Sequence, residues 1–391
     1  MRYVTHSFIV LALAVVTSIA GSNVLEASMN EIFVDYEYGD LKEAIVGVPF
    51  NIYPDLSVAK WAQEALKILP ETEVAKAMEL SGKDSVSIGK YDEMEKENNA
   101  LISILNKHGV KVWRPEVLTR ERVVRNFGEE FIRLAGVSQQ YTRDPILVIG
   151  NNVIENTMGS LYRRCDILGL RRLLMERVMG SGAHWVAMPG VDYSVMIQNG
   201  QFDKTGFPVL EGGDVLVLGK KIFVGTSMNR ATGSSELGYA WLKSYLEPQG
   251  YNVERVRLPE DILHLDVALS VPRAGVIIVC PEVFLDGIPS YFKGWKRIEV
   301  NRDETRHLAA NGLPLDEGHY ILGVNDHFNG KSVKKALEAL GITVYAIYFA
   351  RHNEDGGSIR CSTQPLMRKL SKSGNAKAGY PVGLTNSTDK K

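Results

Sequence analysis

A strand–turn–strand pattern recurs along this chain and restricts the folds that it can adopt. Residues 144–154 (DPILVIGNNVI) and 214–224 (DVLVLGKKIFV) repeat it almost letter for letter, with β-branched and aliphatic residues on both sides of a short turn. Looser copies occupy residues 267–280 and 319–324. Runs of this kind, interrupted by glycine and polar residues, are the sequence signal of a β-hairpin. The pattern therefore predicts a series of similar hairpins.

Helical segments alternate with these hairpins. The spacing of apolar residues predicts helices over residues 90–108, 166–178, 236–246 and 331–340. The first of them is followed by Gly109, a typical C-terminal cap. A strand–strand–helix–strand unit that recurs several times favours an α/β fold in which similar units surround a centre, and an ordinary mixed sheet is the alternative.

Composition narrows the class of protein further. The chain has 391 residues, of which 45% are hydrophobic and 23% are charged, so it can bury a large core. Its 45 lysines and arginines are balanced by 46 aspartates and glutamates. This balance argues against a nucleic-acid-binding protein, since no positive excess is available to neutralise phosphates. Three cysteines are too few for a disulfide-built scaffold or a four-cysteine zinc site.

The N-terminal residues have the pattern of an export signal. An apolar run over residues 8–20 follows a weakly basic start, and small residues at its end suit signal peptidase. The run is too short to span a bilayer comfortably, so we expect residues 1–28 to be cleaved and the mature protein to be secreted or periplasmic. Translation that starts at Met29 is the alternative, and it would leave the protein cytoplasmic. Cys165 and Cys280 could pair in an exported protein.

No linker divides the rest of the chain. Beyond residue 30 the sequence contains no long stretch rich in serine, proline or glycine, whereas its last residues are mostly polar. We therefore expect one domain over residues 29–372 and a polar tail over residues 373–391.

Four short segments concentrate charged or reactive residues beside glycines or strands. Asp144 opens one of the repeated hairpins, and on its own it would be a turn residue. Glu211 is followed by two glycines, which let the backbone approach another group closely and direct the carboxylate. Residues 264–266 (HLD) enter a predicted strand, where His264 and Asp266 would point to the same face. A histidine beside a carboxylate can act as a general acid or base, although many such histidines are structural.

The fourth segment contains Cys361, which follows a double glycine and Arg360. A polar, electropositive environment favours a reactive thiolate over a buried, inert thiol. Together the four segments supply a thiol, a histidine and three carboxylates, a set that suits covalent attack on a guanidinium group. Carboxylates hold the planar cation by forked hydrogen bonds, its resonance-stabilised carbon needs a strong nucleophile, and a histidine can protonate the leaving amine.

In these motifs the sequence resembles the guanidino-group-modifying superfamily, and along most of its length the arginine amidinotransferases. Residues 38–47 (YGDLKEAIVG) are similar to the opening strand of the family, and residues 143–155 (RDPILVIGNNVIE) to its second-blade motif. The segments around Glu211, residues 264–266 and residues 356–361 follow in family order. The resemblance implies a five-bladed, pseudo-symmetric α/β propeller, the pentein fold, built from repeated ββαβ units without a metal or an organic cofactor.

The resemblance also implies a role for each candidate residue. Cys361 would be the nucleophile and His264 the general acid or base. Asp144 and Asp266 would bind the guanidinium group. Glu211 matches the carboxylate that supports the histidine in amidinotransferases and that grips the guanidinium in arginine deiminases.

The motifs of the two enzyme classes are mixed in this chain. Arg163 and Arg230 match positions that hold the substrate carboxylate in arginine deiminases, but a further arginine of those enzymes is Gly356 here. Bacterial arginine deiminases also insert a helical module for which residues 116–143 are too short. The helix predicted at residues 236–246 is similar to that of the amidinotransferases. The overall layout therefore favours a transferase.

We expect an enzyme that transfers the amidino group of L-arginine to an acceptor amine through a covalent intermediate on Cys361. An arginine deiminase-like hydrolase, which forms citrulline and ammonia, is the first alternative, and a catalytically silent ligand-binding propeller is the second. The expected partners are small molecules, with neither nucleic acid nor membrane bound by the mature protein, and a homo-oligomer is an option.

Overall fold

The computed structural model describes residues 31–193, 197–198 and 201–370. The predicted signal segment (residues 1–28) and the predicted polar tail (residues 373–391) lie outside the described residues. Within the described ranges, no helix is long and apolar enough to cross a membrane.

One arrangement of three strands recurs in five sheets of the molecule. In each, the first two strands are antiparallel neighbours and the third lies parallel to the second. Four of these sheets are β6 (Ile146–Ile149), β7 (Asn152–Glu155) and β8 (His184–Ala187); β11 (Val215–Leu218), β12 (Lys221–Ser227) and β13 (Asn252–Leu258); β14 (Leu269–Arg273), β15 (Val276–Val279) and β16 (Lys296–Glu299); and β17 (Leu313–Asp316), β18 (His319–Val324) and β19 (Thr343–Tyr348).

The fifth sheet joins the two ends of the described chain. Its three strands are β20 (Thr363–Lys369), β2 (Asp40–Val46) and β4 (Lys111–Trp113), and β1 (Phe33–Val34) is added beside β20. Two short two-stranded sheets complete the strand inventory of the described residues: β3 (Asn51–Ile52) with β5 (Val137–Ser138), and β9 (Ile197–Gln198) with β10 (Gln201–Phe202).

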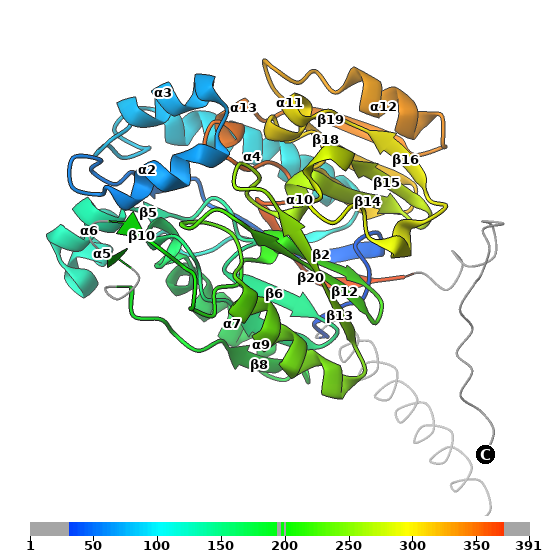
Figure 1. Cartoon of the computed structure of the whole chain (residues 1–391), viewed down its shortest axis with the longest axis horizontal. Helices are drawn as coiled ribbons and strands as arrows, with labels where there is room; N and C mark the ends of the chain where they lie inside the picture. Colours follow the sequence, from blue (N-terminus) through cyan, green and yellow to red (C-terminus); the bar gives the residue numbers. More distant parts are fainter. Residues whose placement is uncertain (1–30, 194–196, 199–200, 371–391) are drawn as a thin grey trace, which may run out of the picture.

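The predicted helices link the second and third strands of four of the sheets. They are α4 (Lys90–Lys107), α7 (Asp166–Val178), α9 (Glu236–Leu246) and α12 (Lys331–Glu338), and Figure 1 shows α7 and α9 together on one side of the molecule. Between β15 and β16 the described chain forms the short 3₁₀ turns η5 (Pro281–Val283) and η6 (Ser290–Phe292) instead. The α/β class is confirmed.

Each helix buries an apolar face against its own sheet. Leu170 and Leu174 of α7 pack with Ile146, Val148 and Val153 of the adjacent hairpin. Because removing a buried leucine side chain leaves a cavity, a Leu→Ala change at either position is expected to cost roughly 2–5 kcal/mol of stability. Apolar residues of α4, α9 and α12 pack on their own sheets in the same way.

Two glycines fix the turns of the two closely matching hairpins. Gly150 and Gly219 have positive φ values of 56° and 66°. Side chains other than glycine rarely adopt this left-handed conformation without strain, so the hairpin prediction and its turn chemistry agree.

The strand predicted at His264–Asp266 is wrong. Leu265–Ala268 form the short helix α10, and β14 begins only at Leu269. The buried carboxylate of Asp214 accepts a hydrogen bond from the backbone N–H of Leu265 at 3.0 Å, and this contact holds the chain in a helical turn. His264 and Asp266 therefore do not share one face of a strand.

The expected pairing of Cys165 with Cys280 is also wrong. All three cysteines are free and buried. Cys165 and Cys280 belong to two separate apolar clusters, where each thiol packs as a small hydrophobic group.

A helical segment between β3 and α4 was not predicted from the sequence. Residues 53–79 contain α2 (Trp61–Ala65), the 3₁₀ turn η1 (Leu66–Ile68) and α3 (Glu71–Glu79), which lie together at one edge of the molecule in Figure 1. We call residues 53–79 the helical wall. The other helical segments of the described chain are α5 (Arg120–Phe127), α6 (Glu129–Ala135), η2 (Leu161–Arg163), η3 (Gly212–Asp214), η4 (Glu247–Gln249), α11 (Arg302–Arg306) and α13 (Ala350–Asn353).

Candidate active site

Four of the candidate residues lie just before inner strands of four different sheets. Asp144 precedes β6, Glu211 precedes η3 and β11, His264 precedes α10 and β14, and Cys361 precedes β20. All four line one pocket of about 160 Å³. The repeated hairpins thus deliver one functional group each to a common centre, and we call Asp144, Glu211, His264 and Cys361 the polar floor of this pocket.

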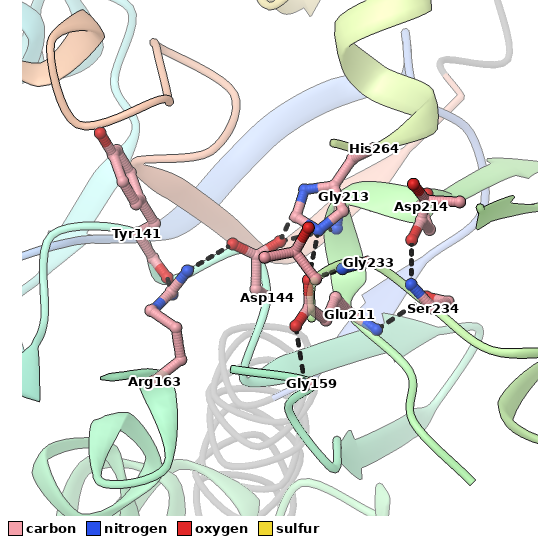
Figure 2. Close-up of polar contacts among 12 residues, drawn as sticks. Tyr141, Asp144, Gly159, Arg163, Glu211, Gly213, Asp214, Gly233, Ser234 and His264 are labelled. Carbon is pink, nitrogen blue, oxygen red and sulfur yellow. Dashed lines mark hydrogen bonds and ion pairs between the residues drawn. The ribbon is translucent and has the colours of Figure 1, made fainter. Parts of the chain in front are cut away.

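His264 and Glu211 form a buried ion pair (Figure 2). Nε2 of His264 lies 2.5 Å from Oε2 of Glu211, and the histidine side chain is only 1% exposed. Burial lowers the pKa of His264, but the carboxylates of Asp144 and Asp214 and the contacts with Cys361 and Glu211 more than offset this and hold the pKa well above its usual value. The imidazole is therefore protonated at neutral pH.

Three hydrogen bonds and the nearby charge of Arg163 keep Glu211 ionised. Its carboxylate accepts bonds from the backbone N–H groups of Gly159 (2.8 Å) and Gly233 (3.0 Å) as well as from His264. Burial raises the pKa of Glu211, but the hydrogen bond and charge of His264, the N–H of Gly159 and the charge of Arg163 lower it to about 2. An ionised Glu211 sets both the charge and the orientation of the imidazole.

The two glycines after Glu211 make room for the polar floor. A side chain at Gly212 would place its Cβ 2.0 Å from the carbonyl oxygen of Arg143, and one at Gly213 would place it 2.4 Å from Nδ1 of His264. The backbone N–H of Gly213 also donates to Oδ1 of Asp144 at 2.9 Å. The close approach expected from the Glu-Gly-Gly-Asp pattern is therefore made to the histidine and to Asp144.

Asp144 lies between the histidine and an arginine (Figure 2). Its Oδ1 is 3.7 Å from Nδ1 of His264, and its Oδ2 accepts a 3.0 Å hydrogen bond from Nη1 of Arg163. Arg163 also donates to Asp166 (2.5 Å) and to the carbonyl of Tyr141 (2.6 Å). Arg163 lines the pocket, but its guanidinium already holds Asp144 in position.

Cys361 is almost completely buried at 2% exposure, at the end of the pocket. Burial and the charge of Asp266 raise the pKa of the thiol to about 11, although His264 lowers it. The prediction that Arg360 gives Cys361 an electropositive environment is wrong. The guanidinium of Arg360 turns into the core, where it pairs with Glu37 at 3.0 Å and with Asp266 at 2.8 Å. Burial and Asp266 therefore favour the neutral form of the thiol, and His264 opposes them.

Asp266 lies behind the thiol and does not line the pocket. Its Oδ2 is 3.7 Å from Sγ of Cys361 and accepts a hydrogen bond from Nη1 of Arg360. Its buried Oδ1 accepts no hydrogen bond from the described residues. Buried carboxylate oxygens are nearly always hydrogen-bonded, so this unpaired Oδ1 directly behind the thiol is unusual, and it leaves negative charge close to Cys361.

The structure does not bring Arg230 to the site. Its side chain is 66% exposed and lies 3.7 Å from Asp203, and it does not line the pocket. The backbone carbonyl of Arg230 accepts a 2.9 Å hydrogen bond from the N–H of Lys204, which fixes this loop with the arginine on the outside. The prediction that Arg230 holds a substrate carboxylate finds no support in this geometry.

Sequence analysis missed two parts of the pocket. The helical wall contributes apolar side chains, and Glu354 and Asp355 contribute carboxylates beside Gly356. Asp355 accepts hydrogen bonds from Lys90 (2.8 Å) and from the hydroxyl of Tyr53 (3.0 Å). The only local signal for the carboxylates was their position before the double glycine, and nothing in the wall's sequence distinguishes it from an ordinary surface helix.

One cluster in the described part of the chain has donor atoms close enough to share a metal ion. It consists of His108, Asp316 and His319, whose potential ligand atoms lie within 4.8 Å of one another. None of the three lines the pocket of the polar floor.

The chain is similar to amidinotransferases in sequence and in fold. No protein-family model matches it. It is 25% identical over 364 residues to the mitochondrial glycine amidinotransferase of Xenopus tropicalis, covering 85% of this chain and 82% of the relative. An amidinotransferase from the saxitoxin biosynthetic pathway of Microseira wollei has the same fold, with a TM-score of 0.66, 24% identity, and coverage of 87% of this chain and 98% of that one.

A more distant structure shares the fold as well. A dimethylarginine dimethylaminohydrolase superposes with a TM-score of 0.53 at 17% identity, over 83% of this chain and 99% of that one. The relatives found by sequence are glycine, arginine:lysine and inosamine-phosphate amidinotransferases. The chain is therefore homologous to amidinotransferases, and it shares its α/β fold with an amidinotransferase and a dimethylarginine dimethylaminohydrolase of known structure.

Proposed function

We propose that this protein transfers the amidino group of L-arginine to an acceptor amine through a covalent intermediate on Cys361. The observation that carries the proposal is the polar floor, where a thiol, a protonated histidine and two carboxylates surround one buried pocket. The amidinotransferase homologues support transfer to an amine over hydrolysis. Arg163 and Glu211, which resemble deiminase residues, are both engaged in holding other members of the floor.

Carboxylates bind the cationic group of the donor in this scheme. Asp144 lines the pocket and Asp266 lies directly behind the thiol, 3.7 Å from Sγ, so both place negative charge beside the site proposed for the guanidinium. Paired carboxylates match the forked N–H groups of such a cation and orient its central carbon toward Sγ of Cys361.

Binding of the cation activates the nucleophile. The thiol pKa of about 11 keeps Cys361 neutral beforehand, and a positive charge placed beside it favours the thiolate, with the proton released to solvent. The thiolate then attacks the guanidinium carbon, and the bond from that carbon to the side-chain nitrogen of arginine breaks. His264 protonates this nitrogen, ornithine leaves, and the amidino group stays on sulfur.

The second half-reaction reverses these roles. The acceptor amine enters the pocket, His264 removes its proton, and the amine attacks the amidino carbon. The carbon–sulfur bond breaks and Cys361 leaves as a thiolate. Glu211 keeps the imidazole oriented through both steps, since it is the hydrogen-bond partner of Nε2.

We further propose that the five sheets close into a five-bladed propeller within one domain. Contacts between β1 and β6, between β14 and β17, and between β17 and β2 support this closure, as does the position of α10 between β11 and β14. Small-molecule substrates and export of the mature protein form part of the same proposal.

Product analysis tests the proposed activity. The protein is incubated with arginine, with and without a panel of primary amines, and ornithine, citrulline and ammonia are measured. We expect ornithine chiefly when an amine is supplied. Steady formation of citrulline and ammonia from arginine alone would replace the transferase with a deiminase.

A further inference from the structure

One side of the pocket is a continuous apolar surface formed by the helical wall. The side chains that line it share an aliphatic or aromatic character: Leu56, Trp61, Ala62, Ala65, Leu66, Ile68, Leu69 and Ala77. The indole N–H of Trp61 donates to the carbonyl of Leu134 at 2.9 Å, so the polar edge of this ring is already engaged. The surface that faces the polar floor is therefore hydrocarbon.

The wall is fixed to the rest of the domain at several points. Asn229 donates to the carbonyl of Glu64 at 3.2 Å, and Arg306 hydrogen-bonds to the carbonyl of Leu69. Leu69 and Ile68 also lie beside Gly356, where an added Cβ would be 3.2 Å from Leu69 and 3.7 Å from Ile68. Because Gly356 has φ +90° and this close neighbour, a polar side chain is excluded from this part of the catalytic loop.

The charges around the pocket do not favour an anion near the wall. Arg163 is the one permanently cationic residue among the described residues that line the pocket, and its donors bind Asp144, Asp166 and Tyr141. Glu354 and Asp355 also line the pocket, and the nearby cation Lys90 is already paired with both carboxylates. A ligand group that rests on the wall is thus expected to carry neither carboxylate nor phosphate.

Arginine, the proposed donor, does not by itself explain why so much of the pocket is apolar. Arginine has only three methylene groups between its guanidinium and its α-carbon, and its remaining groups are charged. Apolar surface is stabilised by contact with apolar groups at roughly 25 cal/mol per Å² removed from water. The acceptor is the other molecule that must occupy this pocket.

We infer that the acceptor is a primary amine with an apolar alkyl or aryl skeleton, and that the helical wall is its binding surface. This inference rests on the proposed transferase function. The amine reaches the carboxylates and histidine of the polar floor, while its hydrocarbon skeleton packs on Leu66, Ile68 and Leu69. The wall then selects the acceptor without touching the reacting atoms.

A homologous series of amines tests the inference. Ornithine release from arginine is measured with ethanolamine, glycine, butylamine, hexylamine and phenethylamine. Since each buried methylene contributes about a fourfold preference, kcat/KM is expected to rise from butylamine to hexylamine by about fifteenfold and to exceed the values for ethanolamine and glycine. A kcat/KM that is independent of chain length, or highest for glycine, would overturn the inference.

A wall variant and a matched control locate the effect. Leu66→Gln is expected to lower kcat/KM for hexylamine at least tenfold and to leave ethanolamine nearly unchanged. Leu237→Gln changes an exposed leucine of α9 that does not line the pocket, and it should alter neither value. Equal losses for both amines in Leu66→Gln would contradict a role in selecting the acceptor.

Labelling of Cys361 by arginine separates this inference from the proposed function. If arginine labels Cys361 in the wild type and in Leu66→Gln alike, the first half-reaction is intact and the amine series reports on the acceptor alone. If arginine never labels Cys361, the proposed function fails and the inference fails with it. If arginine labels Cys361 but glycine is the preferred acceptor, only the inference about the acceptor is overturned.

Discussion

The polar floor and the helical wall face each other across one pocket but are built in opposite ways. The floor takes single residues that precede buried strands of four sheets, and backbone N–H groups hold the carboxylates of Glu211 and Asp144. The wall is one contiguous segment whose apolar side chains in the pocket are buried or half-buried. Because four sheets position the polar floor, its side chains can move little relative to one another. Residues of the helical wall belong to one segment and can be substituted without moving the floor. In our proposal, the floor carries out the chemistry and the wall selects the acceptor.

Removing the nucleophile should produce the largest effect. Cys361→Ala is expected to reduce ornithine release to the background rate while the thermal unfolding midpoint changes little, because the thiol makes no strong structural hydrogen bond. Matched controls are Cys165→Ser and Cys280→Ser, which should retain the chemistry whatever they do to stability. Full activity in Cys361→Ala would remove the residue from the mechanism.

Neutralising a floor carboxylate should have the next largest effect. Glu211→Gln and Asp144→Asn are each expected to lower kcat by about 10²–10³-fold, the usual scale for losing one preorganised charge at a reacting centre. Glu211→Gln should also lower the pKa of His264, because the variant removes the negative charge beside the imidazolium. NMR titration of the imidazole against pH checks this shift, and an unchanged pKa would mean that Glu211 does not set the histidine's charge.

The buried thiol predicts a steep pH dependence of alkylation. With a thiol pKa of about 11, the thiolate fraction of the unliganded protein rises about tenfold per pH unit between pH 8 and pH 10. Inactivation by iodoacetamide should follow this slope and should not level off near neutral pH. Mass mapping of the alkylated cysteine provides the readout, and a plateau below pH 8 would show that the thiol is already ionised without a bound cation.

Arg230 should produce the smallest effect. Because its guanidinium is exposed and paired with Asp203, Arg230→Ala is expected to change the KM for arginine by no more than about twofold. Arg163→Ala serves as the contrast, since it removes the cation that holds Asp144 and should lower kcat. A large rise in KM for Arg230→Ala alone would show that this side chain reaches the substrate.

The sequence predicted the floor better than the wall for a physical reason. Asp144, Glu211 and Cys361 occur in local patterns, a glycine pair or a turn beside a buried strand, that a single sequence displays. The helix at Leu265–Ala268 was missed because it depends on Asp214, a residue about fifty positions away. The direction of Arg360 was missed for the same reason, since its partners Glu37 and Asp266 come from distant parts of the chain.

The wall could not be recognised in this way. Its apolar residues are typical of any amphipathic helix that packs on a core, and only the fold places them opposite the polar floor. The exposed position of Arg230 is likewise a property of the loop that Lys204 holds. Motifs therefore predicted four polar residues that share the pocket, whereas tertiary contacts decided which other side chains surround them.

The most direct test of the account uses arginine with two labels, one in the guanidino carbon and one in the ornithine skeleton. The protein is mixed with this arginine without an acceptor, quenched rapidly, and the peptide containing Cys361 is analysed by mass spectrometry. We predict an adduct that carries the guanidino carbon but not the ornithine skeleton, and that disappears when a primary amine is added. An adduct that retains both labels and decays to citrulline, or the absence of any adduct on Cys361, would contradict amidino transfer at the polar floor.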